Sequence, residues 1–113
     1  MAAPGNRIGK KEKNEDFYKA ILLLKDEEEC YSFFRDVCTI AELRAMEQRF
    51  EVARMLTQGK VYSEIRRETG ASSATVSRVN RMLNYGTGAV GKSVRYDLAA
   101  QQDGENSEGG TTE

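Results

Sequence analysis

The sequence has no histidine and no tryptophan, and its 113 residues include one proline and two cysteines. Without histidine, the chain lacks the usual general base near neutral pH and the commonest metal ligand. Two cysteines do not supply the four ligands of a zinc site, and no glycine-rich phosphate-binding loop is present. We therefore expect neither an enzyme nor a metal or cofactor protein.

Long apolar runs are also missing. The longest, from Ala20 to Leu24, is far shorter than the roughly 20 residues of a membrane-spanning helix. Residues 1–13 lack the apolar stretch of a secretory signal. Cys30 and Cys38 lie among apolar residues, as expected of free thiols in a reducing compartment. These features predict a cytoplasmic protein with no membrane partner.

Charge is unevenly distributed along the chain, although the formal net charge is only −1. Residues 1–13 carry a net charge of +3, residues 14–38 carry −4 and residues 97–113 carry −5. Residues 39–85 hold eight basic and five acidic side chains, and residues 86–96 add two positive charges. A polyanion is therefore expected to bind the middle of the chain.

Helical periodicity predicts an all-α body at residues 14–85, between a flexible basic arm at 1–13 and a flexible acidic tail at 86–113. Within the body, the capping residues Asn14, Asp26 and Thr39 each precede a helical apolar pattern. The third of these helices is the longest and is expected from Ile40 to about Gln58. Its predicted inward residues are Leu43, Met46, Phe50, Ala53 and Leu56.

The most informative segment is residues 61–84. Two short helical patterns flank the three-residue turn Gly70, Ala71 and Ser72, which is the arrangement of a helix-turn-helix. Gly70 accommodates the positive φ of the turn. The apolar residues expected between the two helices are Ile65, Val76 and Val79.

The helix that begins at Ser73 is expected to meet the edges of DNA bases. Its first turns carry small and hydroxyl side chains, which allow close approach to the groove floor. Basic residues on neighbouring helices would neutralise phosphates. The predicted DNA-binding residues are Arg54, Lys60, Arg66, Arg67, Ser72, Ser73, Ala74, Thr75, Ser77, Arg78 and Arg81.

Other functions are compatible with the same helices. A serine-capped helix after a glycine turn also occurs in helical proteins that bind only other proteins, so a protein-protein interaction module is the alternative. Nonspecific packaging of nucleic acid is disfavoured by the net charge of −1. The combination of Gly70, the apolar wedge, the hydroxyl-rich face and local positive charge favours a sequence-specific DNA-binding transcriptional regulator, a repressor, that reads double-stranded DNA.

Over residues 22–85 the chain resembles the YerC/YecD-type branch of the Trp-repressor-like proteins, most strongly in the stretches CTIAELRAMEQRFEVARML and TGASSATVSRVNRMLNYG. The resemblance implies a helical, intertwined homodimer. It also implies that two reading heads meet successive major grooves, about 34 Å apart, on a pseudo-palindromic site. The apolar content of the body supports a dimer independently, because it exceeds what one thin helical layer can bury.

The resemblance also implies an effector pocket. In Trp repressors a threonine, two arginines and small residues hold tryptophan, and Thr39, Arg49 and Arg78 match the threonine and the arginines. The small positions are replaced here by Val79 and Met82, whose bulk is expected to fill the indole slot. Tryptophan is therefore disfavoured as an effector.

Overall fold

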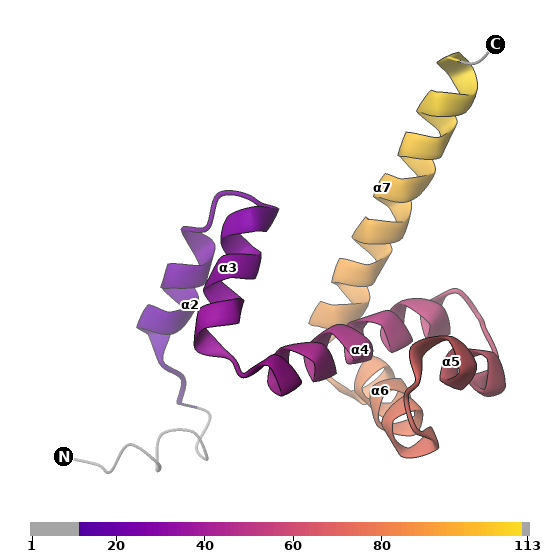
Figure 1. Ribbon diagram of the computed structural model, residues 1–113. Coiled ribbons are helices and arrows are strands. Elements are labelled where there is room, and N and C mark those ends of the chain that lie inside the picture. Colours follow the sequence, from indigo (N-terminus) through magenta and orange to yellow (C-terminus); the bar gives the residue numbers. More distant parts are fainter. Residues whose placement is uncertain (1–11, 112–113) are drawn as a thin grey trace. The chain divides into compact units, whose positions relative to one another are not determined.

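The computed structural model of the chain describes residues 12–111, and within this range it contains helices and no strand (Figure 1). The expected all-α class is confirmed. The helices are α2 (Glu15–Leu22), α3 (Glu27–Val37), α4 (Ile40–Thr57), α5 (Tyr62–Thr69), α6 (Ser73–Tyr85) and α7 (Ala89–Thr111). They fall into two compact units, Met1–Ile40 and Ala41–Glu113. Most of the predicted basic arm, residues 1–11, lies outside the described residues.

The helices of the first unit begin at the residues predicted to cap them. The Asn14 side chain accepts a hydrogen bond from the N–H of Phe17, at 3.2 Å. The Asp26 side chain accepts one from the N–H of Glu29, at 2.8 Å, while the Glu29 carboxylate accepts one from the N–H of Lys25. Each bond satisfies a main-chain donor in or just before the first helical turn.

The first unit does not bury a core of its own. Aromatic rings meet between its helices, and the Phe17 and Phe33 ring centroids lie 5.9 Å apart. Even so, neither α2 nor α3 has a buried residue. Leu22 and Leu23 are 83% and 76% exposed. Much of the apolar surface of this unit is therefore left uncovered.

The core lies in the second unit, where α4, α5, α6 and α7 contribute to one apolar cluster. The buried members are Val52, Ala53, Met55, Ile65, Ala71, Val76, Val79 and Val94. This cluster includes all three residues of the predicted wedge. The two helices of the helix-turn-helix and the turn between them are thus held by one core.

Within the single chain, the core covers the second half of the predicted inward face of α4 and leaves much of its first half exposed. Ala53 is fully buried and Leu56 packs against the core, but Met46 and Phe50 are 38% and 40% exposed. The buried residues that the prediction omitted are Val52 and Met55. The difference arises because the core of this unit draws only on the C-terminal turns of α4.

The predicted flexible tail at residues 86–113 differs from the structure in the first turns of α7, which are helical and packed. Val94 is fully buried in the core, and Val90 and Leu98 pack against it. These three residues recur at i, i+4 and i+8, a helical spacing. The glycines at 86, 88 and 91 make this pattern weak in the sequence. The later turns of α7 extend away from the other helices of the unit (Figure 1).

We expect Val94→Ala to lower the free energy of unfolding by about 2 kcal/mol, because it removes two buried methyl groups and leaves a cavity. Denaturant unfolding of the full chain would measure the change. Val61→Ala is the matched control, because Val61 is 63% exposed. Equal stability of the two variants would contradict the role of α7 in the core.

Candidate nucleic-acid interface

The turn between α5 and α6 depends on Gly70. Its φ of 74° lies in the left-handed region, where a side chain is unfavourable, and its N–H donates to the carbonyl of Arg66. The next residue, Ala71, is 5% exposed, and its N–H donates to the Thr69 hydroxyl at 3.1 Å. The chain can therefore reverse within three residues while its main-chain donors remain paired.

Gln48 connects this turn to α4. Its side-chain Nε2 donates to the main-chain carbonyl of Thr69 at 3.1 Å, across 21 positions of sequence. Carbonyls in the last turn of a helix have no partner within the helix, so this bond satisfies an acceptor that otherwise needs water. Sequence analysis did not identify Gln48, because its partner is a main-chain atom that no residue pattern reveals.

Ser72 begins α6 as its N-cap. Its Oγ accepts a hydrogen bond from the N–H of Thr75 and donates one to the Thr75 hydroxyl, both at 3.1 Å. This arrangement confirms the predicted start of the helix. The Thr75 side chain is half-buried and already bonded within the cap.

One face of α6 is exposed along its length, because its opposite face is buried. Val76 is 0% and Val79 is 1% exposed, which fixes the rotation of the helix. The exposed face contains Ser73, Ala74, Ser77, Arg78 and Arg81. It therefore carries small side chains in its first turns and two guanidinium groups further along.

Three comparisons place this arrangement among known proteins. Residues 12–96 match the family model described as Trp repressor protein. The chain belongs to the Trp repressor family. It is 57% identical over 75 residues to YerC from Bacillus subtilis (strain 168), a protein of uncharacterised function, with 66% of this chain and 72% of YerC covered.

Two solved structures of the Trp repressor type share the fold. A candidate Trp repressor from Staphylococcus aureus has a TM-score of 0.71 and 43% identity, with 74% of this chain and 84% of that chain covered. A TrpR-like protein from Eubacterium eligens ATCC 27750 has a TM-score of 0.70 and 51% identity, with 73% and 84% covered. The fold is therefore Trp-repressor-like, and the family suggests a DNA-binding regulator.

The basic residues predicted to contact phosphates differ in whether a carboxylate pairs with them. Arg66 is exposed on α5, and among the side chains described no ion pair engages it. Lys60 lies 3.4 Å from Glu64 and Arg67 lies 3.7 Å from Glu68. Such exposed pairs are weak, worth about 0–1 kcal/mol, so both cations can exchange partners.

Arg54 has a structural role that the sequence analysis missed. Its Nε lies 3.0 Å from Glu51, and its Nη1 lies 3.8 Å from Asp97 and 3.1 Å from Gln101. The pKa of Arg54 is raised, first by the hydrogen bond to Glu51 and then by the charge of that carboxylate. Its guanidinium thus joins α4 to α7. The other cations of the predicted set have fewer carboxylate partners.

The residues matched to the tryptophan pocket of the Trp repressor family belong to different units of the chain. Arg49 and Arg78 are exposed in the second unit, and Thr39 belongs to the first. Val79 is 1% exposed within the core, and Met82 packs against that core. Both side chains that replace the family's small residues are therefore engaged by the core of the second unit.

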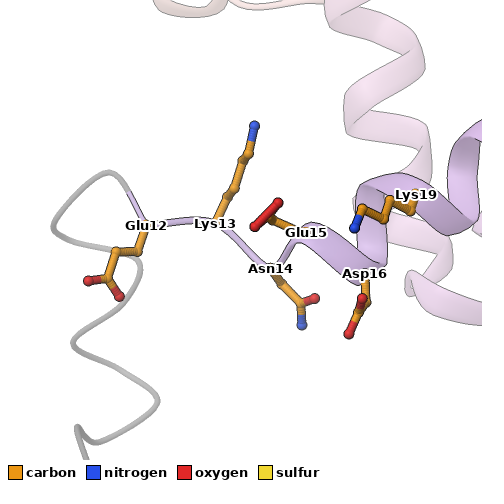
Figure 2. Close-up of a pocket in the computed structure, with 6 residues that line it drawn as sticks. All are labelled: Glu12, Lys13, Asn14, Glu15, Asp16 and Lys19. Carbon is orange, nitrogen blue, oxygen red and sulfur yellow. The ribbon is translucent and has the colours of Figure 1, made fainter.

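Within the described residues, hollows lie on α3, with a volume of about 510 Å³, and between α4 and α5, with a volume of about 370 Å³. A hollow of about 480 Å³ lies at the start of α2, but its side chains, including Glu12, Lys13 and Asp16, point in different directions (Figure 2). No three cysteines or carboxylates within the described part of the chain gather as metal ligands. No helix there is long and apolar enough to cross a membrane.

We expect Gln48→Leu to lower the free energy of unfolding by about 1–2 kcal/mol, because it removes the donor to the Thr69 carbonyl without removing much volume. Gln58→Leu, an exposed change near the end of the same helix, is the control. Chemical denaturation of both variants tests this role. If Gln48→Leu is as stable as the control, the bond contributes little.

Proposed function

We propose that the protein is a sequence-specific DNA-binding transcriptional regulator, a repressor, that reads double-stranded DNA through α6 as a homodimer. The observation that carries this proposal is the exposed face of α6. Burial of Val76 and Val79 directs small hydroxyl and methyl groups outward, on a helix held rigidly behind a tight turn. This is the form that a major-groove reading helix requires. Such a regulator works in the cytoplasm, where bacterial DNA lies.

Base recognition is assigned to the first turns of α6. Ser73 and Ser77 offer hydroxyl groups that donate or accept, and the Ala74 methyl is suited to contact with a thymine methyl. Thr75 contributes less, because its hydroxyl is engaged by Ser72. Arg78 and Arg81 lie further along the same face, where guanidinium groups reach either guanine or phosphate.

Phosphate contacts are assigned to cations around the reading helix. Arg66 is free of carboxylates among the described side chains, whereas Lys60 and Arg67 can leave weak surface pairs. Arg54 is omitted from this set because its charge is engaged by Glu51 and Asp97. The contacts position the duplex without reading its sequence.

Apolar exposure supports the homodimer. Large apolar side chains remain uncovered in both units, and a second copy of the chain is the partner proposed to bury them. They include Leu22, Leu23, Val37, Ile40, Met46 and Phe50. A dimer also supplies the second reading head that a pseudo-palindromic site needs.

Selection from random duplex DNA is expected to enrich a short inverted repeat. Ser77→Ala should change the preferred bases, because it removes a hydroxyl from the reading face. Arg66→Ala should weaken binding equally for all sequences and reduce the salt dependence of log K by about one for each phosphate that it leaves without a cation. Fluorescence titration across a salt series measures both effects. Absence of DNA binding would favour the protein interaction module, and equal binding of all sequences would favour packaging.

The melting temperature should rise with protein concentration, because dissociation accompanies unfolding of a dimer. Phe50→Asp should weaken dimerisation at least tenfold, since it puts a charge on apolar surface proposed to be buried between subunits. Tyr62→Asp is the control, because Tyr62 and Phe50 are similarly exposed, at 39% and 40%. Sedimentation equilibrium would measure the dissociation constants. A wild-type monomer at all concentrations would refute the dimer.

A further inference from the structure

A long stretch of the second unit contains no acidic residue. From Thr69 to Tyr96 the chain has no aspartate or glutamate, and it contains Arg78, Arg81, Lys92 and Arg95. The stretch covers the turn, all of α6 and the first two turns of α7. It therefore continues beyond the helix-turn-helix as a positively charged segment.

The carboxylates that border this stretch are engaged by other cations. Glu68, just before it, lies 3.7 Å from Arg67. Asp97, just after it, lies 3.8 Å from the Nη1 of Arg54. Neither carboxylate is shown paired with Lys92 or Arg95, so the positive charge at the start of α7 is not cancelled by the described neighbours.

The two faces of α7 have different chemistry. Val90, Val94 and Leu98 pack toward the core, whereas Lys92, Arg95 and Tyr96 are exposed on the remaining surface. Lys92 and Arg95 lie about 4.5 Å apart along the helix axis. The Lys92 Nζ lies 5.8 Å from the ring centroid of Tyr96, which is 67% exposed.

This basic face of α7 is close to the end of α6. Gly91 is buried, and a Cβ placed on it would lie 3.8 Å from Leu83 Cδ2 and 3.3 Å from Arg95 Nη1. The first turns of α7 therefore pack beside the C-terminal half of α6. Because Val94 is fully buried, the core also holds these turns in place beside the reading helix.

We propose that Lys92 and Arg95 form a second phosphate-contacting element, which binds the sugar-phosphate backbone of the same duplex beside the groove that α6 reads. This inference rests on the proposed function and extends its interface to α7. Two cations about one turn apart, next to an exposed tyrosine and with the nearby Asp97 paired to Arg54, suit a phosphate backbone rather than base edges. The element adds affinity that is independent of sequence.

The test uses the full chain and a fluorescein-labelled duplex of random sequence, titrated from about 50 to 200 mM salt. The double variant Lys92→Gln/Arg95→Gln should bind more weakly at low salt. Its slope of log K against log salt should be smaller by about 0.9 for each phosphate no longer neutralised, or about 1.8 in all for each subunit. Its melting temperature and the site selected from random DNA should match the wild type. Lys92→Arg/Arg95→Lys, which keeps both charges, should restore the slope.

The matched control is Lys19→Gln/Arg35→Gln, which removes two exposed positive charges from the first unit. Its slope should equal that of the wild type. If both double variants reduce the slope equally, net charge alone explains the effect and the α7 element is refuted. If neither reduces the slope while Arg66→Ala does, the α7 element is refuted but the proposed function stands. If the wild type does not bind DNA, both proposals fail.

Discussion

The burial of one side of α6 is the constraint on which the rest of the second unit depends. Val76 and Val79 share a core with Ile65, Val52 and Val94, so residues from three other helices hold this short helix in place. Rotation of α6 about its axis would expose those valines, at roughly 1.5–3 kcal/mol for each side chain. The outward face of α6 is consequently fixed before any partner binds, and binding does not have to order it.

Local chemistry made much of this architecture predictable. The caps Asn14, Asp26 and Ser72 and the left-handed Gly70 act within a few residues of sequence, and the corresponding helices begin or end where these residues indicate. The face exposed by α6 followed from the spacing of Val76 and Val79. Individual DNA contacts remain predictions, because they depend on a molecule that the sequence does not contain.

The failures concern relations between distant segments. Periodicity shows which residues of α4 share a face, but not which part of that face is covered within the same chain, and Met46 and Phe50 lie on the part that is not. Counting charges did not reveal that Arg54 lies 3.8 Å from Asp97, across 43 positions of sequence. The glycine-rich segment after Tyr85 gave only a weak helical pattern, although its apolar residues Val90, Val94 and Leu98 belong to or pack against the core. Each of these contacts joins segments that are distant in sequence, so only the folded chain reveals it.

The cap at Ser72 has a consequence for how closely the chain itself can approach a duplex. Ser72 satisfies the amide of Thr75 through its hydroxyl and that of Val76 through its carbonyl. The amides of Ser73 and Ala74 come earlier in the first turn, where an α-helix provides no acceptor of its own. They belong to residues of the exposed face with small side chains. The first turn of α6 thus combines small side chains with main-chain N–H groups, at the end of the helix where its dipole is positive.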